Sequence, residues 1–382
     1  MLSASLLGVD NQLLTMIVGA IVFSVLLTTC TSLQRQPYVL ILGLILAAVA
    51  YRRAFAGFLV VNAVAYAVVR WLGGRADAAR RWQWTCVLLA ALIAIFTAGR
   101  LLHWEERALL PGGIRLTLYS LDMWLLLRLV TLFWEVGSGA RPAPSISKFV
   151  LWTTLPLTLG GPVLRYSQLP ARIVADRAVL RSSAWWLGLG AGACKLIAGS
   201  GLAVFSAMTA RYWAAHPSWP KALGTLITGP WSFYLTYAGY FQLMESLGRS
   251  CGFPLPPSFN VPFGRENISA FWANWNMSAT NVFRDYLFFN RWGFSAYNAY
   301  LNTMIVFVLV GLWHAANAYW LLWGFLHGLL FCTFMVWRRY AKPFIRLPLQ
   351  GTMISRAGAA ALTYVCVCAC WYVPLKILQR IT

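Results

Sequence analysis

The sequence predicts an all-α fold, a polytopic bundle of about nine to eleven transmembrane helices with further re-entrant or interfacial helices. Two observations support this fold class. Of the 382 residues, 60% are hydrophobic and 11% are charged, whereas roughly a quarter of a soluble domain is charged. Apolar stretches that approach the roughly 20 residues needed for a span recur along the whole length. An ordinary soluble domain is thereby excluded.

The predicted spans follow one another with short connections. In chain order they are 13–30, 38–50, 54–71, 84–99, 117–134, 149–164, 184–208, 222–247, 302–318, 319–337 and 357–378. Arg52 and Arg53 divide one apolar run, and prolines and glycines within 156–162 interrupt another. A broken helix at membrane depth is tolerated only where protein buries it or where it lines a cavity. We therefore expect the interrupted segments to lie inside the bundle.

A single integral-membrane domain over residues 1–382 is the simplest organisation. The polar connections are each shorter than about 25 residues, too short for a separate soluble domain. Gly188 and Gly192 predict close packing of their helix against a neighbour. Dense prolines bar a continuous helix before about residue 264, and the amphipathic stretch after them is expected at the membrane surface.

The net charge of +21 comes from 31 Lys and Arg against 10 Asp and Glu. The basic residues are spread over short connections, notably 70–81, 165–181 and 338–346, so these loops are expected to face the cytoplasm and anionic lipid headgroups. No basic motif of a nucleic-acid-binding protein is present, which excludes that class of partner. The eight cysteines lack the spacing of metal ligands, so no metal site is predicted.

His314 is the strongest candidate for chemistry, because an ionisable residue inside an apolar span is costly and marks a functional site by default. Gly311 allows a close approach, and the small residues Ala315 and Ala316 leave room for a substrate. An imidazole is well matched to proton transfer near neutral pH. The alternative is a core histidine bonded to a backbone carbonyl.

Asn276 is the natural partner of His314. Its amide can donate hydrogen bonds to a developing oxyanion or orient an acyl carbonyl. The alternatives are a turn residue or, in the sequence N-M-S, a glycosylation acceptor. No G-x-S-x-G elbow is present, so a histidine base with an amide donor favours direct acyl transfer to a hydroxyl.

Other polar residues in apolar surroundings have structural explanations. His327 follows His314 by thirteen residues and could not share its site on one continuous helix. Arg284 and Asp285 can pair with each other. Asp122 and Glu245 are expected to face the bundle interior and to pair with an arginine such as Arg128 or Arg165.

Several motifs together resemble the membrane-bound O-acyltransferase family. They are F-W-x-x-W-N-M-S-x-x-x-x-x-R-D-Y-L at 271–287, G-L-W-H-A-A at 311–316, W-G-x-L-H-G at 323–328, G-G-P-V-L-R-Y at 160–166 and the stretch 240–260 that leads into the first of these. The resemblance covers roughly residues 110–330 in the family's order. It is most similar to the bacterial branch that serves alginate O-acetylation, related exopolysaccharide acetylation and D-alanylation of teichoic acids. That branch usually carries histidine where this chain has Asn276.

The resemblance implies a helical bundle with a central funnel or tunnel and with His314 and Asn276 as the catalytic pair. Trp275 and Trp313 beside them, and His327, are implied as further substrate-binding residues. Arg165, Arg284 and Asp285 complete the substrate-binding candidates, as residues that are structural or line the entrance for the donor.

The implied reaction transfers a small acyl group, such as acetyl, from a cytoplasmic thioester donor to a hydroxyl of an envelope or secreted polysaccharide. The donor is acyl-CoA or acyl carrier protein, no tightly bound cofactor is expected, and an extracytoplasmic partner transferase would complete the export. The expected location is the bacterial cytoplasmic membrane. The alternatives are acylation of a lipid, D-alanyl transfer to a teichoic-acid-like polymer, or a transporter without covalent chemistry, although no inverted repeat is evident.

Overall fold

The computed structural model describes residues 11–30, 36–102, 121–170, 178–212, 219–253, 255–288, 299–341 and 352–381. The regular elements within these ranges are all helical, which confirms the predicted all-α class. The chain divides into two compact units, Met1–Pro257 and Ser258–Thr382. The expectation of one membrane domain over the whole chain stays a prediction, as does the central tunnel.

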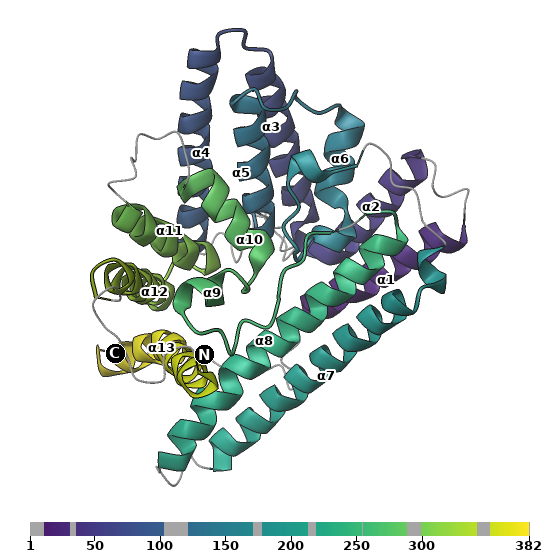
Figure 1. Ribbon diagram of the computed structural model, residues 1–382. Helices are drawn as coiled ribbons and strands as arrows, with labels where there is room; N and C mark the ends of the chain where they lie inside the picture. Colours follow the sequence, from purple (N-terminus) through teal and green to yellow (C-terminus); the bar gives the residue numbers. More distant parts are fainter. Residues whose placement is uncertain are drawn as a thin grey trace, which may run out of the picture. The chain divides into compact units, whose positions relative to one another are not determined.

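The described residues of the first unit form eight α-helices, shown in purple to green in Figure 1. They are α1 (Asn11–Thr29), α2 (Gln36–Tyr51), α3 (Phe55–Gly73), α4 (Ala78–Leu101), α5 (Met123–Gly137), α6 (Ile146–Thr154), α7 (Ser183–Tyr212) and α8 (Trp219–Ser250). Short 3₁₀ turns occur where the sequence predicted interruptions, at Arg52–Ala54 between α2 and α3 and at Pro156–Thr158 after α6.

The second unit begins with short helices and continues with three long ones. They are α9 (Ile268–Trp272), α10 (Met277–Val282) with a π-helical continuation over Phe283–Phe288, α11 (Ala299–His314), α12 (Ala318–Val336) with a π-helical end at Trp337–Ala341, and α13 (Met353–Ile381). Helix α12 lies between α11 and α13 and contacts both (Figure 1).

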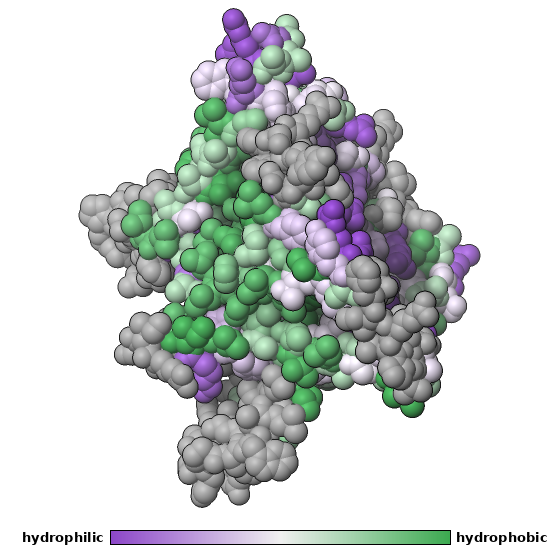
Figure 2. Space-filling model, turned by 60° about the vertical axis from the view of Figure 1, so that its left-hand side comes forward, coloured by the Kyte–Doolittle hydropathy of each residue, from purple (hydrophilic) through white to green (hydrophobic). Residues whose placement is uncertain are grey.

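Within the described residues, five helices are long and apolar enough to cross a membrane. They are Phe55–Gly73, Ala78–Leu101, Ser183–Met208, Ala318–Ala341 and Met353–Leu378. They match five of the predicted spans. Their apolar side chains face outward, as Leu187 and Ile197 do with 72% and 71% of their surface exposed. On the face drawn in Figure 2, hydrophobic residues cover most of the described surface, and hydrophilic residues gather at the tip where α3 joins α4. The protein is therefore an integral membrane protein.

The predicted total of nine to eleven spans stays a prediction, because only the described residues could be compared with it. Three further helices, α1, α2 and α11, are apolar over 16 residues each, at Leu14–Thr29, Gln36–Tyr51 and Ala299–His314. The window 149–164 does not form one helix, since α6 has nine residues and ends before Pro156. Apolar composition alone therefore does not show where a helix ends.

Side chains fix the starts of several helices. Asp77 accepts hydrogen bonds from the backbone nitrogens of Ala79 and Arg80 at the start of α4, at 2.9 and 3.2 Å. Asp122 does the same at the start of α5, at 2.8 Å from each of two backbone nitrogens. Such caps satisfy backbone donors that have no partner within the helix.

The predicted ion pair of Asp122 with an arginine is not found among the described residues. Asp122 is instead bonded by the Tyr51 hydroxyl at 2.5 Å, besides capping α5. Arg128, which is 1% exposed, donates from Nη1 to the carbonyl oxygens of Trp152 and Thr153 and to the hydroxyl of Thr158, at 3.2–3.3 Å. The partners of Arg128 are thus backbone carbonyl oxygens, which the break after α6 leaves without a partner in the helix, and not the carboxylate of Asp122 as predicted.

Helices α7 and α8 run side by side, and glycines let them approach closely (Figure 1). A Cβ placed on Gly192 would lie 3.1 Å from the carbonyl oxygen of Gly239. A Cβ on Gly188 would lie 2.7 Å from the Ser246 hydroxyl. The packing role predicted for the Gly188–Gly192 pair is therefore confirmed.

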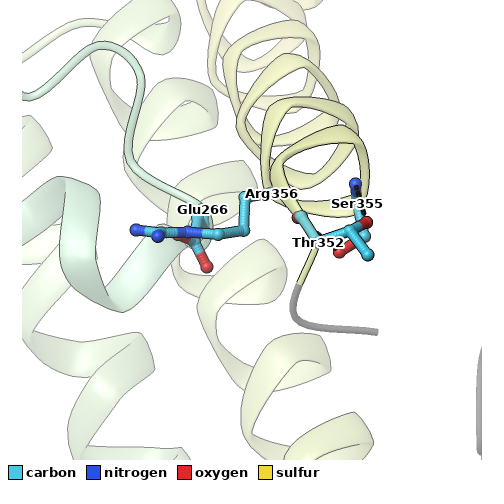
Figure 3. Close-up of polar contacts among 4 residues, drawn as sticks. All are labelled: Glu266, Thr352, Ser355 and Arg356. Carbon is cyan, nitrogen blue, oxygen red and sulfur yellow. Dashed lines mark hydrogen bonds and ion pairs between the residues drawn. The ribbon is translucent and has the colours of Figure 1, made fainter. Parts of the chain in front are cut away.

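In the second unit, an exposed ion pair connects the segment before α9 with the first turn of α13. Arg356 Nε lies 2.5 Å from Glu266 Oε1. Figure 3 shows this pair beside Thr352, whose hydroxyl accepts a hydrogen bond from the backbone nitrogen of Ser355 at 3.3 Å as α13 begins. The pair is solvent-accessible, so its contribution to stability is on the order of 0–1 kcal/mol.

Candidate functional site

The segment that carries Asn276 is held in shape by its own polar groups. The backbone nitrogen of Met277 donates to the carbonyl oxygen of Ser258 at 2.7 Å, and that of Asn260 donates to the carbonyl oxygen of Asn274 at 3.1 Å. These bonds pair the stretch after the prolines with the end of the Trp-rich motif. The motif is therefore positioned by backbone contacts within the second unit.

Arg265 strengthens this arrangement. Its Nε donates to the carbonyl oxygen of Val261 at 3.0 Å, and its Nη2 donates to the carbonyl oxygen of Asn260 at 2.7 Å and to Asn274 Oδ1 at 3.1 Å. The sequence analysis missed Arg265, because an isolated arginine in a polar connection resembles any exposed basic residue. Its position next to Gly264, which has a positive φ of 90°, was the available sign of a tight turn.

Asn276 occupies the turn just before α10 with a left-handed backbone conformation, φ 41° and ψ 51°. Its side chain does not cap the helix. Its Oδ1 accepts only a long hydrogen bond of 3.5 Å from the Ser278 hydroxyl, and its Nδ2 makes none with the described residues. The backbone of Asn276 thus forms the turn, while the two N–H donors of its half-buried side-chain amide remain available to bind another group.

His314 is the last residue of α11 and is half-buried. Its ring stacks on Trp320, with centroids 4.4 Å apart and planes at 19°, and also contacts Trp313 at 4.7 Å and Trp323 at 5.5 Å. No hydrogen bond to the imidazole is found within the described ranges. The alternative of a core histidine bonded to a backbone carbonyl is therefore not what the structure contains.

Close backbone contact between α11 and α12 explains how Trp320 reaches His314. Asn317 begins α12 by accepting a hydrogen bond from the backbone nitrogen of Trp320 at 3.1 Å. A Cβ on Gly311 would meet the Trp320 carbonyl oxygen, and one on Gly324 would meet the Phe307 carbonyl oxygen. Both glycines are therefore required for this approach, as was expected of Gly311.

His327 lies nearer to His314 than the argument from a continuous helix allowed. The helix ends at His314 and a new one starts at Ala318, so the angle computed along one helix does not apply. Both imidazoles contact Trp323, with ring centroids at 5.5 Å for His314 and 4.5 Å for His327. His327 is fully buried.

A series of ring contacts connects the Trp-rich motif with His314. Trp275, 7% exposed, contacts Trp371 of α13 at 6.5 Å, Trp371 contacts Trp320 at 6.3 Å, and Trp320 stacks on His314. Trp313 is buried against Phe283 at 5.5 Å. Trp320 and Trp371 could not be singled out from the sequence, because such contacts between helices leave no pattern in the chain, and Trp323 was marked only as part of the motif at 323–328.

The remaining predicted site residues lie apart from this cluster of rings or in the other unit. Arg284 Nε pairs with Asp285 Oδ1 at 2.7 Å, as the sequence suggested, and the side chains are 52% and 33% exposed. The role of this pair toward a substrate stays a prediction. Arg165 belongs to the first unit, where its backbone nitrogen donates to Gln168 Oε1 at 3.0 Å. Its role toward a donor stays a prediction.

The chemical capacity of the site follows from these groups. An imidazole without a hydrogen-bond partner in the described part can accept and release a proton, and an amide with free donors can bind an oxygen. Among the described residues there is no group of three His, Cys, Asp or Glu that could hold a metal ion. The arrangement suits acid–base chemistry on an oxygen-containing substrate.

Several curated proteins are similar to this chain. A probable alginate O-acetylase AlgI of Pseudomonas aeruginosa is 35% identical over 98 residues, which are 25% of this chain and 19% of that protein. A probable alginate O-acetylase AlgI of Pseudomonas fluorescens is 26% identical over 270 residues, 67% of this chain and 51% of that protein. A teichoic acid D-alanyltransferase of Bacillus subtilis is 28% identical over 162 residues, 38% of this chain and 40% of that protein.

The matched segments span about half or less of the length of these relatives. No model of a protein family matches the chain. The resemblance to the bacterial branch of the membrane-bound O-acyltransferases, which the motifs indicated, is nevertheless confirmed, since the chain is similar to alginate O-acetylases and a teichoic acid D-alanyltransferase that are members of that family.

Proposed function

We propose that this protein is a membrane-embedded O-acyltransferase that moves an acetyl or other small acyl group from a cytoplasmic thioester to a hydroxyl of an envelope or secreted polysaccharide. The observation that carries the proposal is His314, a half-buried imidazole without a hydrogen-bond partner among the described residues, at a helix end against Trp320. The similarity to proteins named for O-acetylation of alginate supports the acyl group and the class of acceptor.

In the proposed reaction His314 acts as general base. It takes the proton of the acceptor hydroxyl as the oxygen attacks the thioester carbonyl carbon, so that a C–O bond forms. The C–S bond then breaks, and the proton passes from the imidazolium to the leaving thiolate, which restores neutral His314. The Asn276 amide donates a hydrogen bond that orients the acceptor or stabilises charge on the reacting oxygen.

The side of the membrane from which the acyl donor enters is inferred from the distribution of basic residues. Acyl-CoA carries phosphates and acyl carrier protein carries a phosphopantetheine, so either donor is attracted by the Arg-rich loops at 70–81, 165–181 and 338–346. Residues 171–177 and 342–346 of these loops lie outside the described residues. The cytoplasmic membrane of a bacterium and an extracytoplasmic partner transferase belong to the same proposal.

D-alanyl transfer to a teichoic-acid-like polymer is the second candidate function. It is favoured by the relative from Bacillus subtilis, of which the matched segment covers 40%. The base and the amide would have the same roles, and only the acyl group and acceptor would differ.

Membrane vesicles that contain the wild-type protein test the proposal when supplied with radiolabelled acetyl-CoA. The expected product is label in a base-labile ester on polymer, and His314→Ala should lower its formation by about 10²–10⁴-fold at equal expression. His103→Ala, a histidine outside the motifs, is the matched control. Ester formation at the wild-type rate by the His314 variant would refute the proposal. Label that enters vesicles without ester formation would indicate a transporter, and transfer only of D-alanine from its carrier protein would favour the second candidate.

A further inference from the structure

Three buried rings in the second unit contact one another beside His314. Trp272 of α9 is 9% exposed, Trp323 of α12 is 2% exposed and His327 of α12 is fully buried. Ring centroids lie 5.9 Å apart for the two tryptophans, 5.2 Å for Trp272 and His327, and 4.5 Å for Trp323 and His327. We call these residues the nitrogen cluster.

All the ring nitrogens of the nitrogen cluster lack a partner. Nε1 of Trp272, Nε1 of Trp323 and both Nδ1 and Nε2 of His327 are buried and make no hydrogen bond within the described part of the chain. An indole nitrogen is only a donor, and a neutral imidazole has one donor and one acceptor, so the cluster presents three donors and one acceptor. Nearly all buried polar groups of native proteins are partnered. Four such nitrogens on three rings in mutual contact suit an oxygen acceptor from outside the protein chain.

The cluster adjoins the proposed base. Trp323 contacts the His314 ring almost perpendicularly, at 5.5 Å and 82°, and it contacts His327 on the same helix. The walls around these nitrogens are aromatic, since Phe307 stacks on His327 at 6.2 Å. Donors in a water-poor aromatic environment act more strongly on developing charge than donors in water do.

We propose that the nitrogen cluster binds the carbonyl oxygen of the acyl group, with Trp323 and His327 as additional catalytic residues. This inference rests on the proposed function and deepens it. When the acceptor hydroxyl attacks, the electron pair of the carbonyl moves onto this oxygen, and its negative charge is stabilised by the indole and imidazole N–H groups. The charge returns to re-form the carbonyl as the thiolate leaves, and Asn276 is then free to orient the acceptor.

A buried water would satisfy the same donors, so the experiment must separate the two oxygen sources. Trp272→Phe and Trp323→Phe keep an aromatic ring and remove one N–H each. Trp152→Phe removes an indole N–H that is also buried and without a partner among the described residues but belongs to the first unit, and it serves as the matched control. His327→Gln keeps a donor and an acceptor, whereas His327→Phe keeps neither.

Infrared spectra of purified protein with acetyl-CoA labelled with carbon-13 at the carbonyl report this contact without any turnover. A hydrogen-bonded carbonyl stretches at lower frequency, so the wild-type protein and Trp152→Phe should show a downward shift on binding. The shift should be smaller in Trp323→Phe and Trp272→Phe. Turnover in the vesicle assay should fall about 10²–10³-fold for Trp323→Phe, and His327→Gln should retain more activity than His327→Phe.

The outcomes distinguish the two proposals. An equal carbonyl shift in all variants, with only thermal stability lowered by Trp323→Phe, would mean that the cluster binds water, and the inference would be overturned. The carbonyl shift could be smaller in Trp323→Phe than in the wild type while the wild type forms no ester. That result would support the carbonyl site and refute the acyl transfer. Failure of acetyl-CoA to bind would overturn both.

Discussion

Gly311 offers a quantitative test of how the site is built. It lies in α11 one turn before His314, and a Cβ there would press on the Trp320 carbonyl oxygen and lie 3.1 Å from its carbonyl carbon. These are backbone atoms, so they cannot move aside as the end of a flexible side chain could. Gly311→Ala must therefore separate α11 from α12 or bend one of them, and the stacking of Trp320 on His314 changes in either case.

The expected magnitude is a difference of two effects. Alanine is favoured over glycine in a helix by about 0.5–1 kcal/mol. Overpacking costs about 1–3 kcal/mol, and backbone contact places this substitution toward the upper end. The net destabilisation is therefore about 1–2 kcal/mol. Gly190→Ala in α7, where nothing lies within 4 Å of the new Cβ, has only the favourable effect and is the matched control.

Thermal unfolding of both variants in the same detergent, followed by tryptophan fluorescence, measures the difference. Gly311→Ala should unfold at a lower temperature than the wild type, and Gly190→Ala at the same or a higher temperature. Acyl transfer by Gly311→Ala, measured per folded protein, should also fall because the His314 ring is displaced. If Gly311→Ala is as stable and as active as Gly190→Ala, the close approach of the two helices is not what positions the histidine.

Further substitutions address the other parts of the site. Asn276→Ala should lower turnover about 10²–10³-fold with little loss of protein, and Asn276→His should retain more, because an imidazole can donate a hydrogen bond; unchanged turnover in Asn276→Ala would remove this residue from the site. Arg265→Ala loses three hydrogen bonds and should destabilise the protein by about 1–3 kcal/mol in an unfolding assay, with Arg265→Lys intermediate; equal stability of both variants would show that the loop holds without this side chain. His327→Ala should cost less activity than His314→Ala, and equal losses would mean that the roles of the two histidines are misassigned. Ala78→Cys, in a protein without native cysteines, should react with an impermeant maleimide only from the cytoplasmic side, and labelling only from outside would invert the orientation.

The long apolar helices were predictable because one uniform signal defines them. Runs such as 184–208 and 357–378 contain no competing pattern, and the structure forms helices over both. The interruption at Arg52 was also predictable, because paired arginines disrupt an apolar helix. The exact ends of the helices were not predictable, since the apolar run 38–50 lies within a helix that covers Gln36–Tyr51.

The site was predictable only in part, because the sequence shows which residues are unusual but not which residues they contact. Asn276 and His314 stand out because they are polar residues in apolar or aromatic surroundings. Trp371 is one tryptophan among 20, and its contacts with the Trp-rich motif and with α12 exist only in the folded chain. The partner of Arg128 was mistaken because the carbonyls that it binds become available only where α6 ends.

The left-handed backbone at Asn276 also limits which residues evolution can place there. Outside glycine, asparagine, aspartate and histidine adopt this conformation far more readily than other residues, and β-branched residues hardly adopt it. Of these residue types, asparagine and histidine can also donate a side-chain hydrogen bond as neutral groups, whereas glycine and ionised aspartate cannot. A replacement of Asn276 by histidine would therefore be compatible with both the turn before α10 and the donor.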